Sequence, residues 1–231
     1  MKPVRHSARQ HLRTIQKRLG LSRVFRKFAS KYDMVYLGSV HRDDEARLVR
    51  GVTLSRTQVD AHYCVGSAYG RGVIFVQRSD VERSAYQKPV RHTWNILQID
   101  LADTARLPHV FVERYDAAHS TYAEKLSAVH RDWVVTPPSL LAQYDSLFLS
   151  RYRVHSANIT SALVGDYLSP LVASQIAHYF SQFSFEIVDD TLLVYFVSRY
   201  PLSDQLDHMV KAGVWLADEI EKTRQTNPFA S

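Results

Sequence analysis

Apolar and polar positions follow their clearest pattern near the C-terminus. Phe183, Phe185 and Ile187 alternate with polar residues, which is typical of a strand with one buried face. A second apolar run follows at residues 192–197, and helical spacing of apolar residues then extends over residues 203–220. The pattern predicts a β-hairpin with an amphipathic helix packed across it.

The rest of the chain contains further segments with a strand or helix period. The predicted strands are residues 34–37, 49–54, 59–68, 73–77, 92–101, 108–113 and 147–155, and the predicted helices are residues 116–130 and 170–180. We expect residues 79–91 to form a loop, and residues 108–113 to pair antiparallel with residues 92–101. Strands follow one another through short turns rather than alternating with helices. The sequence therefore predicts an α+β fold of antiparallel sheets with packed helices, preceded by a basic helical N-terminal arm.

The N-terminal arm, residues 1–31, differs from the rest of the chain in charge. It holds ten Lys and Arg residues and no acid, whereas the other 200 residues hold 19 basic and 23 acidic residues, a net charge of −4. On a helical wheel, the apolar residues of its first half lie opposite a basic face. The apolar residues are Val4, Ala8, Leu12, Ile15 and Leu19, and the basic residues are Lys2, Arg5, Arg9, Arg13 and Lys17.

A second apolar stripe follows Gly20, where we expect the first helix to end. It consists of Leu21, Val24, Phe25 and Phe28. In one continuous helix this stripe would be turned by about half a revolution from the first. We therefore expect two helices with a bend near Gly20, the second stripe packed on the body and the first free to meet a membrane or a partner.

Pro137 and Pro138 mark the best internal boundary, because proline continues neither a helix nor a central strand. We divide the chain into the arm (1–31), a β-rich α+β region (32–136) and a strand–helix–hairpin–helix region (137–222). The sequence is compatible both with two separate regions in the body and with one continuous domain.

Composition and motifs exclude several classes of protein. The single cysteine, Cys64, excludes an internal disulfide framework, which favours either a reducing compartment or a protein indifferent to redox conditions. No apolar run reaches the roughly 18–20 residues that span a bilayer, and no apolar segment follows the N-terminal charges as in a secretory signal. Phosphate-binding loops, dinucleotide fingerprints and GxSxG elbows are absent from the sequence. We expect a cytoplasmic protein that needs no cofactor.

Three groups of polar residues carry candidate chemistry. Asp60, His62 and Cys64 share one face of a strand by alternation, and these residue types bind zinc, but the close ligand pairs of zinc sites are missing. Adjacent aspartates at 189 and 190 can hold a hard cation, although between two apolar runs such a pair usually forms a turn. We interpret both groups as structural and predict no metal site.

The third group consists of Asp100, His109, Glu113 and His119. These residues could in principle assemble a metal-dependent hydrolase. Their spacing is not selective for catalysis, and solvated strand ends explain them more simply. We predict no catalytic residue and keep this group as a polar cluster that the fold either assembles or separates.

Four stretches together resemble an uncharacterised family of bacterial proteins from reduced-genome, Saccharibacteria-like organisms. They are VRGVTLSRTQVDAHYCVG (49–66), TWNILQIDL (93–101), LPHVFVE (107–113) and FEIVDDTLLVYF (185–196). The resemblance covers most of residues 32–220. It implies no activity, ligand or catalytic residue.

The functional hypothesis rests on the N-terminal arm. A segregated apolar and basic wheel is typical of a helix that lies on an anionic membrane surface. We therefore expect a non-catalytic protein docked peripherally on such a surface through Lys2, Arg5, Arg9, Arg13, Lys17 and Arg18. The alternatives are nucleic-acid binding by the same arm, a metal-dependent hydrolase built on the polar cluster, and a module that binds another protein.

Overall fold

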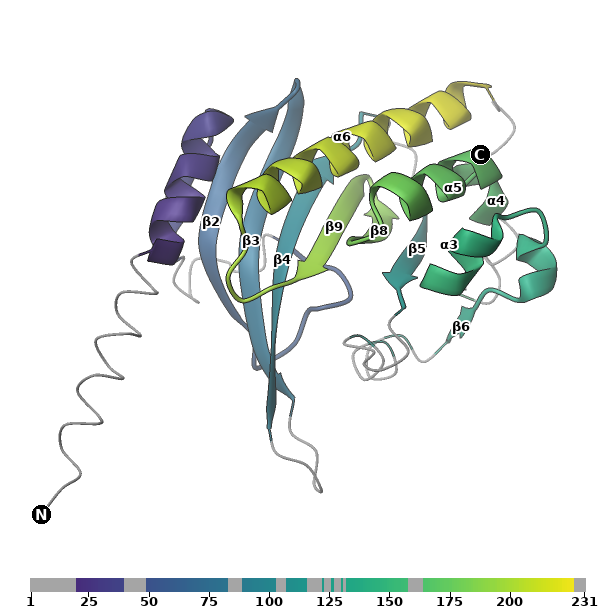
Figure 1. Cartoon of the computed structure of the whole chain (residues 1–231), viewed down its shortest axis with the longest axis horizontal. Coiled ribbons are helices and arrows are strands. Elements are labelled where there is room, and N and C mark those ends of the chain that lie inside the picture. Colours follow the sequence, from purple (N-terminus) through teal and green to yellow (C-terminus); the bar gives the residue numbers. More distant parts are fainter. Residues whose placement is uncertain are drawn as a thin grey trace, which may run out of the picture.

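The computed structural model describes residues 20–39, 49–82, 89–102, 107–115, 122, 126, 130, 132–157 and 164–226. Among these residues, nine strands form one antiparallel sheet in the order β1-β2-β3-β4-β9-β8-β5-β7-β6 (Figure 1). The strands are β1 (Val35–Gly38), β2 (Val59–Ala68), β3 (Arg71–Glu82), β4 (Val90–Asp100), β5 (Leu107–Arg114), β6 (Trp133–Val135), β7 (Tyr152–Ala157), β8 (Ser184–Asp189) and β9 (Thr191–Val197). The helices are residues 20–31, η1 (Pro138–Leu141), α3 (Ser146–Arg151), α4 (Val164–Tyr167), α5 (Pro170–Tyr179) and α6 (Ser203–Thr226).

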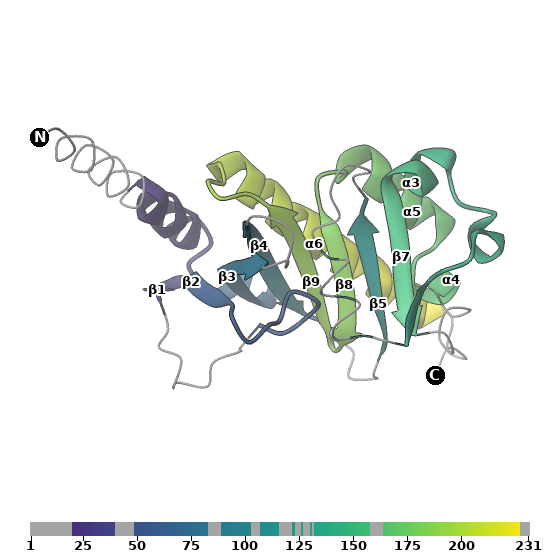
Figure 2. The same ribbon diagram turned by 90° about the horizontal axis from the view of Figure 1, so that it is seen from below.

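The predicted α+β class with antiparallel strands is confirmed. The helices gather on one face of the sheet, with α6 lying across its middle (Figures 1 and 2). The C-terminal hairpin and helix form as expected, with Phe185 opposite Val194 in the β8–β9 register. Helix α5 also forms as predicted, with the Ser169 hydroxyl accepting a hydrogen bond from the Val172 amide at 3.3 Å.

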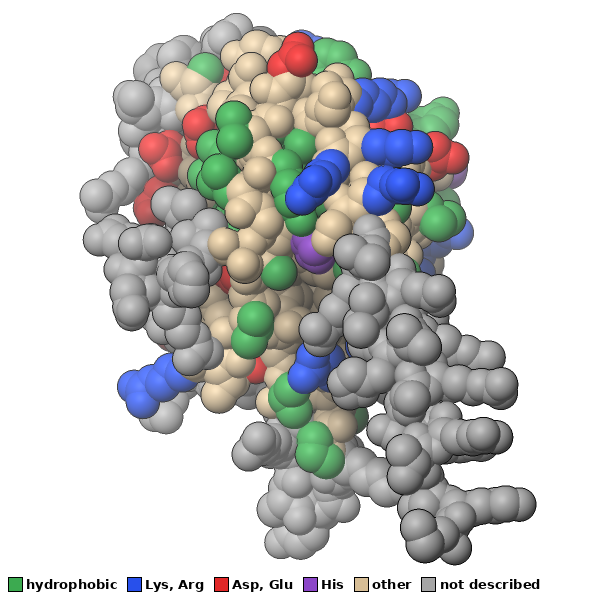
Figure 3. Space-filling model, turned by 90° about the vertical axis from the view of Figure 1, so that its left-hand side faces the viewer, with side chains coloured by type: hydrophobic (Ala, Val, Ile, Leu, Met, Phe, Trp, Pro, Cys, Tyr) green, Lys and Arg blue, Asp and Glu red, His purple; other side chains and the backbone are tan. Residues whose placement is uncertain are grey.

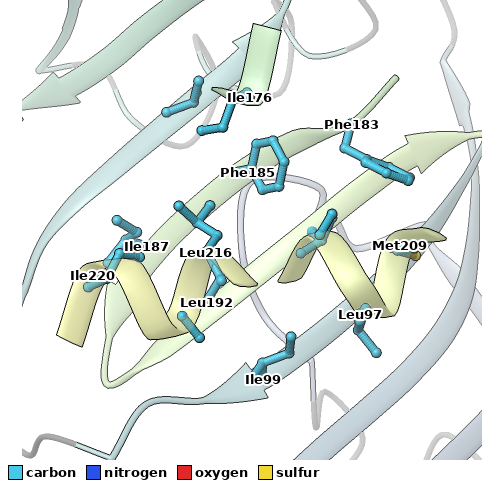
Figure 4. Packing of buried hydrophobic residues seen from close by; sticks show 14 of the residues in the cluster. Leu97, Ile99, Ile176, Phe183, Phe185, Ile187, Leu192, Met209, Leu216 and Ile220 are labelled. Carbon is cyan, nitrogen blue, oxygen red and sulfur yellow. The ribbon is translucent and has the colours of Figure 1, made fainter. Parts of the chain in front are cut away.

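The main core lies between these helices and the sheet (Figure 4). The apolar side of α6, which includes Met209, Leu216 and Ile220, packs on strand residues such as Leu97 and Ile99. All five side chains are at most 3% exposed. The helical spacing seen in the sequence therefore marks the buried side of α6, as the amphipathic pattern requires.

The second stripe of the arm packs on the sheet as predicted. Phe25 is fully buried and Phe28 is 4% exposed, and their ring centroids lie 5.2 and 5.3 Å from that of Phe75 on β3. Leu21 and Val24 pack against the same cluster. Residues 1–19, including the first stripe and its six cations, lie outside the described residues.

Two predicted strands differ from the structure. Residues 49–54 are an irregular segment rather than a strand, and Gly51 there has a φ of +96°. Residues 147–155 contain the end of a helix, α3, and only then strand β7. Asp145 caps α3 by accepting a hydrogen bond from the Leu147 amide at 2.6 Å, so the chain turns into a helix where the apolar period alone indicated a strand.

Two predicted pairings also differ. Strand β5 is not the neighbour of β4, because β9 occupies that edge, with Leu97 opposite Val194. The β3–β4 hairpin continues through residues expected to be a loop, to Glu82 opposite Val90. Asp80 adds to the polarity of that stretch, but its side chain is buried and accepts hydrogen bonds from the Ser55 and Thr57 hydroxyls. Polarity therefore does not mark a loop there.

The sheet crosses the boundary placed at residues 136 and 137. Strands β4 and β5 precede it in the chain, yet β4 pairs with β9, and β5 pairs with both β7 and β8. Residues from both regions therefore share one continuous sheet and one core on its helical side.

Candidate functional site

The second face of the sheet carries a smaller core with polar groups buried in it. Its strand residues include Trp94, Phe111 and Tyr195, which pack with Val49 and Val52 of the irregular segment at residues 49–58 and with Tyr122 and Leu126. The Leu126 amide donates to the Tyr122 carbonyl at 2.8 Å, the spacing of one helical turn.

Glu186 on β8 is the central polar group of this face and is fully buried. Its carboxylate accepts hydrogen bonds from the Tyr195 hydroxyl and from the Val52 amide, the latter at 2.9 Å, and His109 Nε2 lies 2.5 Å from its other oxygen. Glu186 therefore has three polar partners, as a buried carboxyl group requires. Burial and the adjacent Glu186 raise the pKa of Tyr195 well above its ordinary value, so the hydroxyl stays protonated and donates.

Gly51, in the irregular segment at residues 49–58, packs directly against this carboxylate. A Cβ atom at position 51 would lie 2.2 Å from the Tyr195 hydroxyl and 2.6 Å from Glu186 Oε2, and the backbone φ of +96° also favours glycine. The next residue, Val52, donates its backbone amide to Glu186. Close backbone contact at Gly51 and Val52 therefore helps to hold the segment on the sheet.

A second histidine–carboxylate pair lies beside the first. Phe111 is directly opposite Glu186 on one neighbouring strand and opposite His155 on the other. His155 Nε2 lies 2.8 Å from the buried carboxylate of Glu113, and His109 with Glu186 forms the corresponding pair on the other side of Phe111.

Aromatic rings enclose the outer side of His109. Its ring meets the Trp133 ring edge-on with centroids 4.5 Å apart, and His130 stacks on the same Trp133 ring at 4.2 Å. Burial, with the nearby His109, lowers the pKa of His130, so this imidazole is neutral at pH 7. The His130 and Trp133 rings cover part of His109, whose side chain remains 28% exposed.

Arg78 forms the other buried polar group of this face. Its guanidinium is fully buried and makes two bonds of 2.8 Å to the Asp60 carboxylate, one to the Val49 carbonyl at 2.6 Å and one to the Thr53 hydroxyl at 3.1 Å. The Tyr63 hydroxyl also donates to Asp60. This ion pair fastens the irregular segment at residues 49–54 to β2 and β3.

The structure separates the residues of the zinc candidate. Asp60 bonds Arg78 on the second face, whereas Cys64 lies in the core on the helical face. A bulge between Ala61 and Cys64 breaks the alternation, and His62 adopts a φ of +58° and stacks on Phe25 at 4.5 Å. Within the described ranges, no group of three His, Cys, Asp or Glu residues is placed to hold a metal ion.

Burial raises the pKa of the Cys64 thiol to about 12. The thiolate is the reactive form, so native protein at pH 8 should react with Ellman's reagent only on the timescale of unfolding. One equivalent of thiol should appear at once in denaturant. Immediate reaction of the native protein would show that the helix over residues 20–31 opens readily from the sheet, since Phe25 covers Cys64.

The residues of the hydrolase candidate are placed as follows. His109 and Glu113 share a face of β5 but bond different partners, Glu186 and His155. Asp100 ends β4, three strand spacings from β5 in the sheet, roughly 14 Å away. His119 lies outside the described residues. Asp189, with a φ of +52°, turns the chain between β8 and β9.

Sequence reasoning missed Glu186, which alternation assigned to an exposed face. A signal was present in the neighbouring strand. The uninterrupted apolar run of residues 192–197 indicates a strand buried on both faces, so polar residues beside it on β8 are buried as well. That reasoning identifies a buried Glu186 without naming its partners.

A basic surface lies at the opposite end of the sheet from β6. The helix over residues 20–31 exposes Arg23, Arg26, Lys27 and Lys31, of which Lys31 forms an ion pair with Asp207. Figure 3 looks at this end of the molecule, where Lys and Arg side chains gather on one side. The Arg26 guanidinium carbon lies 5.4 Å from the centre of the Tyr36 ring on β1. The described part of the arm is thus a docked helix with an outward basic face.

Edge strand β1 adds apolar surface to the same end. Val35 and Leu37 are 60% and 50% exposed, while Tyr36 between them turns toward the helix and bonds His62 at 2.8 Å. Residues 32–34 alone separate the helix from this strand. We name the exposed side chains Arg23, Arg26, Lys27, Val35 and Leu37 the β1-edge surface.

Comparison with known proteins identifies a solved structure with a similar fold. No family model matches the chain, and no curated protein matches it. A solved structure does match, the crystal structure of the mycobacterial trehalose monomycolate transport factor A, TtfA, with a TM-score of 0.57 and 13% sequence identity. The match covers 89% of this chain and 95% of that one. At this identity, the likeness to TtfA shows the fold alone.

In the part of the chain that the structure describes, no helix is both long enough and apolar enough to cross a membrane.

Proposed function

We propose that this protein docks peripherally on an anionic membrane surface through its basic N-terminal arm and has no catalytic role. The observation that carries the proposal is the anchoring of the arm. Phe25 and Phe28 fix residues 20–31 on the sheet and leave Arg23, Arg26 and Lys27 facing solvent. The body therefore presents a basic helix in a fixed orientation.

The charge of the arm supports a reversible contact. Each Lys or Arg near an anionic surface contributes about 1 kcal/mol, and the sequence of residues 1–19 supplies six more cations without an acid. These are Lys2, Arg5, Arg9, Arg13, Lys17 and Arg18. The apolar stripe among them adds the burial that an interfacial helix needs.

A second observation that supports the proposal is the fold shared with TtfA. TtfA is named as a transport factor for trehalose monomycolate, a sugar esterified with a fatty acid. We infer a lipid-associated role for this chain from the arm, and the shared fold supports it without specifying a lipid. The resemblance to the uncharacterised bacterial family adds no activity.

Co-sedimentation with vesicles tests the proposal. The full chain should pellet with vesicles that contain anionic lipid and stay in the supernatant with purely zwitterionic vesicles. Deleting residues 1–19 removes six cations and should weaken the partition coefficient more than roughly 100-fold. The same deletion should leave Tm within a few degrees, because Phe25 and Phe28 remain in place.

A matched control separates the arm from net charge. Replacing Arg5, Arg9 and Arg13 by Gln should weaken binding, whereas replacing three exposed cations of the body by Gln should not. The body positions are Arg56, Arg199 and Lys211. Equal pelleting of all variants would contradict docking through the arm. Tight, salt-sensitive binding to duplex DNA or RNA without binding to vesicles would favour the nucleic-acid alternative.

A further inference from the structure

We propose that the β1-edge surface is a second membrane contact, in which Val35 and Leu37 enter the bilayer interface while Arg23, Arg26 and Lys27 lie over the anionic headgroups. The inference rests on the proposed function and adds an orientation to it. The sheet would meet the membrane with its β1 edge, and the opposite edge, β6, would point away.

The exposure of these aliphatic side chains is the first reason. An edge strand offers unpaired backbone groups, and proteins usually protect such edges with charge, proline or a covering segment. Val35 and Leu37 instead leave half or more of their side chains in contact with water. Strand β1 is also only four residues long, which makes it a poor template for pairing with another sheet.

The position of the cations beside this edge is the second reason. Arg26 lies against Tyr36 on β1, and Val35 and Leu37 project from the other side of the same short edge strand. The helix and β1 lie side by side at one end of the sheet (Figure 2). Asp33, exposed in the turn between them, adds one negative charge against the three cations of the surface. The net charge of these four groups remains positive.

The combination of groups identifies the occupant as an anionic bilayer. Phosphate groups of a nucleic acid would satisfy the cations but offer nothing to Val35 and Leu37. A second copy of this chain would cover the apolar edge but would bring the same cations together. A bilayer interface takes aliphatic side chains and attracts cations at the same depth, as interfacial helices show.

A fluorescent label tests the orientation directly. Leu37→Cys provides a labelling site, because the native Cys64 is fully buried. The emission maximum of an environment-sensitive fluorophore at position 37 should shift to shorter wavelength when anionic vesicles are added. The fluorophore should also become protected from an aqueous quencher. The matched control is Val135→Cys on β6, also an edge strand and also 50% exposed, where neither change should occur.

A second variant measures the contribution to binding without a label. Replacing Val35 and Leu37 by Thr places β-branched side chains, which a strand favours, at both positions and removes most of the apolar contact. Vesicle binding of the full chain should weaken about tenfold, the change expected when two half-exposed aliphatic side chains lose burial. Thermal unfolding should stay unchanged, since both side chains are exposed.

Each outcome decides between the two proposals. If the full chain ignores anionic vesicles, docking fails and this inference fails with it. If binding depends on residues 1–19 but the label at position 37 stays in water and the Thr variant binds equally, docking stands and the orientation is wrong. A blue shift that needs no vesicles and grows with protein concentration would assign the edge to a second copy and would overturn the inference.

Discussion

Replacing Gly51 by Ala is expected to lower the free energy of unfolding by about 3–5 kcal/mol. Two independent costs add at this position. The backbone φ of +96° is unfavourable for any residue with a Cβ, and the new atom would lie 2.2 Å from the Tyr195 hydroxyl and 2.6 Å from Glu186 Oε2. Neither neighbour can retreat easily, because both are fully buried. Chemical denaturation of the variant measures the loss.

Gly70→Ala is the control for the backbone cost alone. Gly70 has a φ of +81° in the β2–β3 turn, and nothing lies within 4 Å of a Cβ built there. This variant should lose only about 1–2 kcal/mol, the cost of a left-handed conformation for a residue with a side chain. Equal losses for the two variants would show that the contact between Gly51 and the Glu186 network is not tight.

Replacing Asp60 by Ala is expected to cost about 3–5 kcal/mol, because it leaves the guanidinium of Arg78 buried without a counter-charge. Arg78 is fully buried, and Asp60 supplies two of its hydrogen bonds, both of 2.8 Å. The Val49 carbonyl and the Thr53 hydroxyl remain, but neither is charged. Denaturant unfolding monitored by tryptophan fluorescence reports the change.

A double substitution separates the charge from the packing. Arg78→Met replaces the charged side chain by an apolar one of similar length. The double variant Asp60→Ala with Arg78→Met should therefore be more stable than Asp60→Ala alone. The Tyr63 hydroxyl loses the same acceptor in both variants, and its effect cancels in the comparison. A double variant less stable than Asp60→Ala would mean that Arg78 stabilises the fold without needing Asp60.

The sequence by itself determined the elements whose signals are local. The β8–β9 hairpin and α6 follow from alternation and helical spacing, and α5 follows from Ser169 before Pro170. The docking of Phe25 and Phe28 also follows, because an apolar stripe on a helix requires burial somewhere. These features depend on residues within a few positions of one another, which one sequence displays directly.

Local patterns were misleading where a capping residue set the secondary structure or where a bulge set the direction of the side chains. Asp145 turns residues 146–151 into a helix although their apolar positions allowed a strand. The bulge at His62 sends Asp60 and Cys64 to opposite faces although strict alternation places them together. In both cases one backbone detail changes the direction of several side chains, because the strand period is only two residues.

Only the tertiary structure decided which strands are neighbours and which polar groups are buried. The Val52 amide and the Glu186 carboxylate that it bonds are 134 residues apart. Strand β9 lies between β4 and β8, an order that no local sequence period records. Alternation shows that a strand has a buried face but not which segment covers it. The partners of Glu186 and Arg78 are set by segments that meet only when the whole sheet has formed, because burial is a property of the assembled chain.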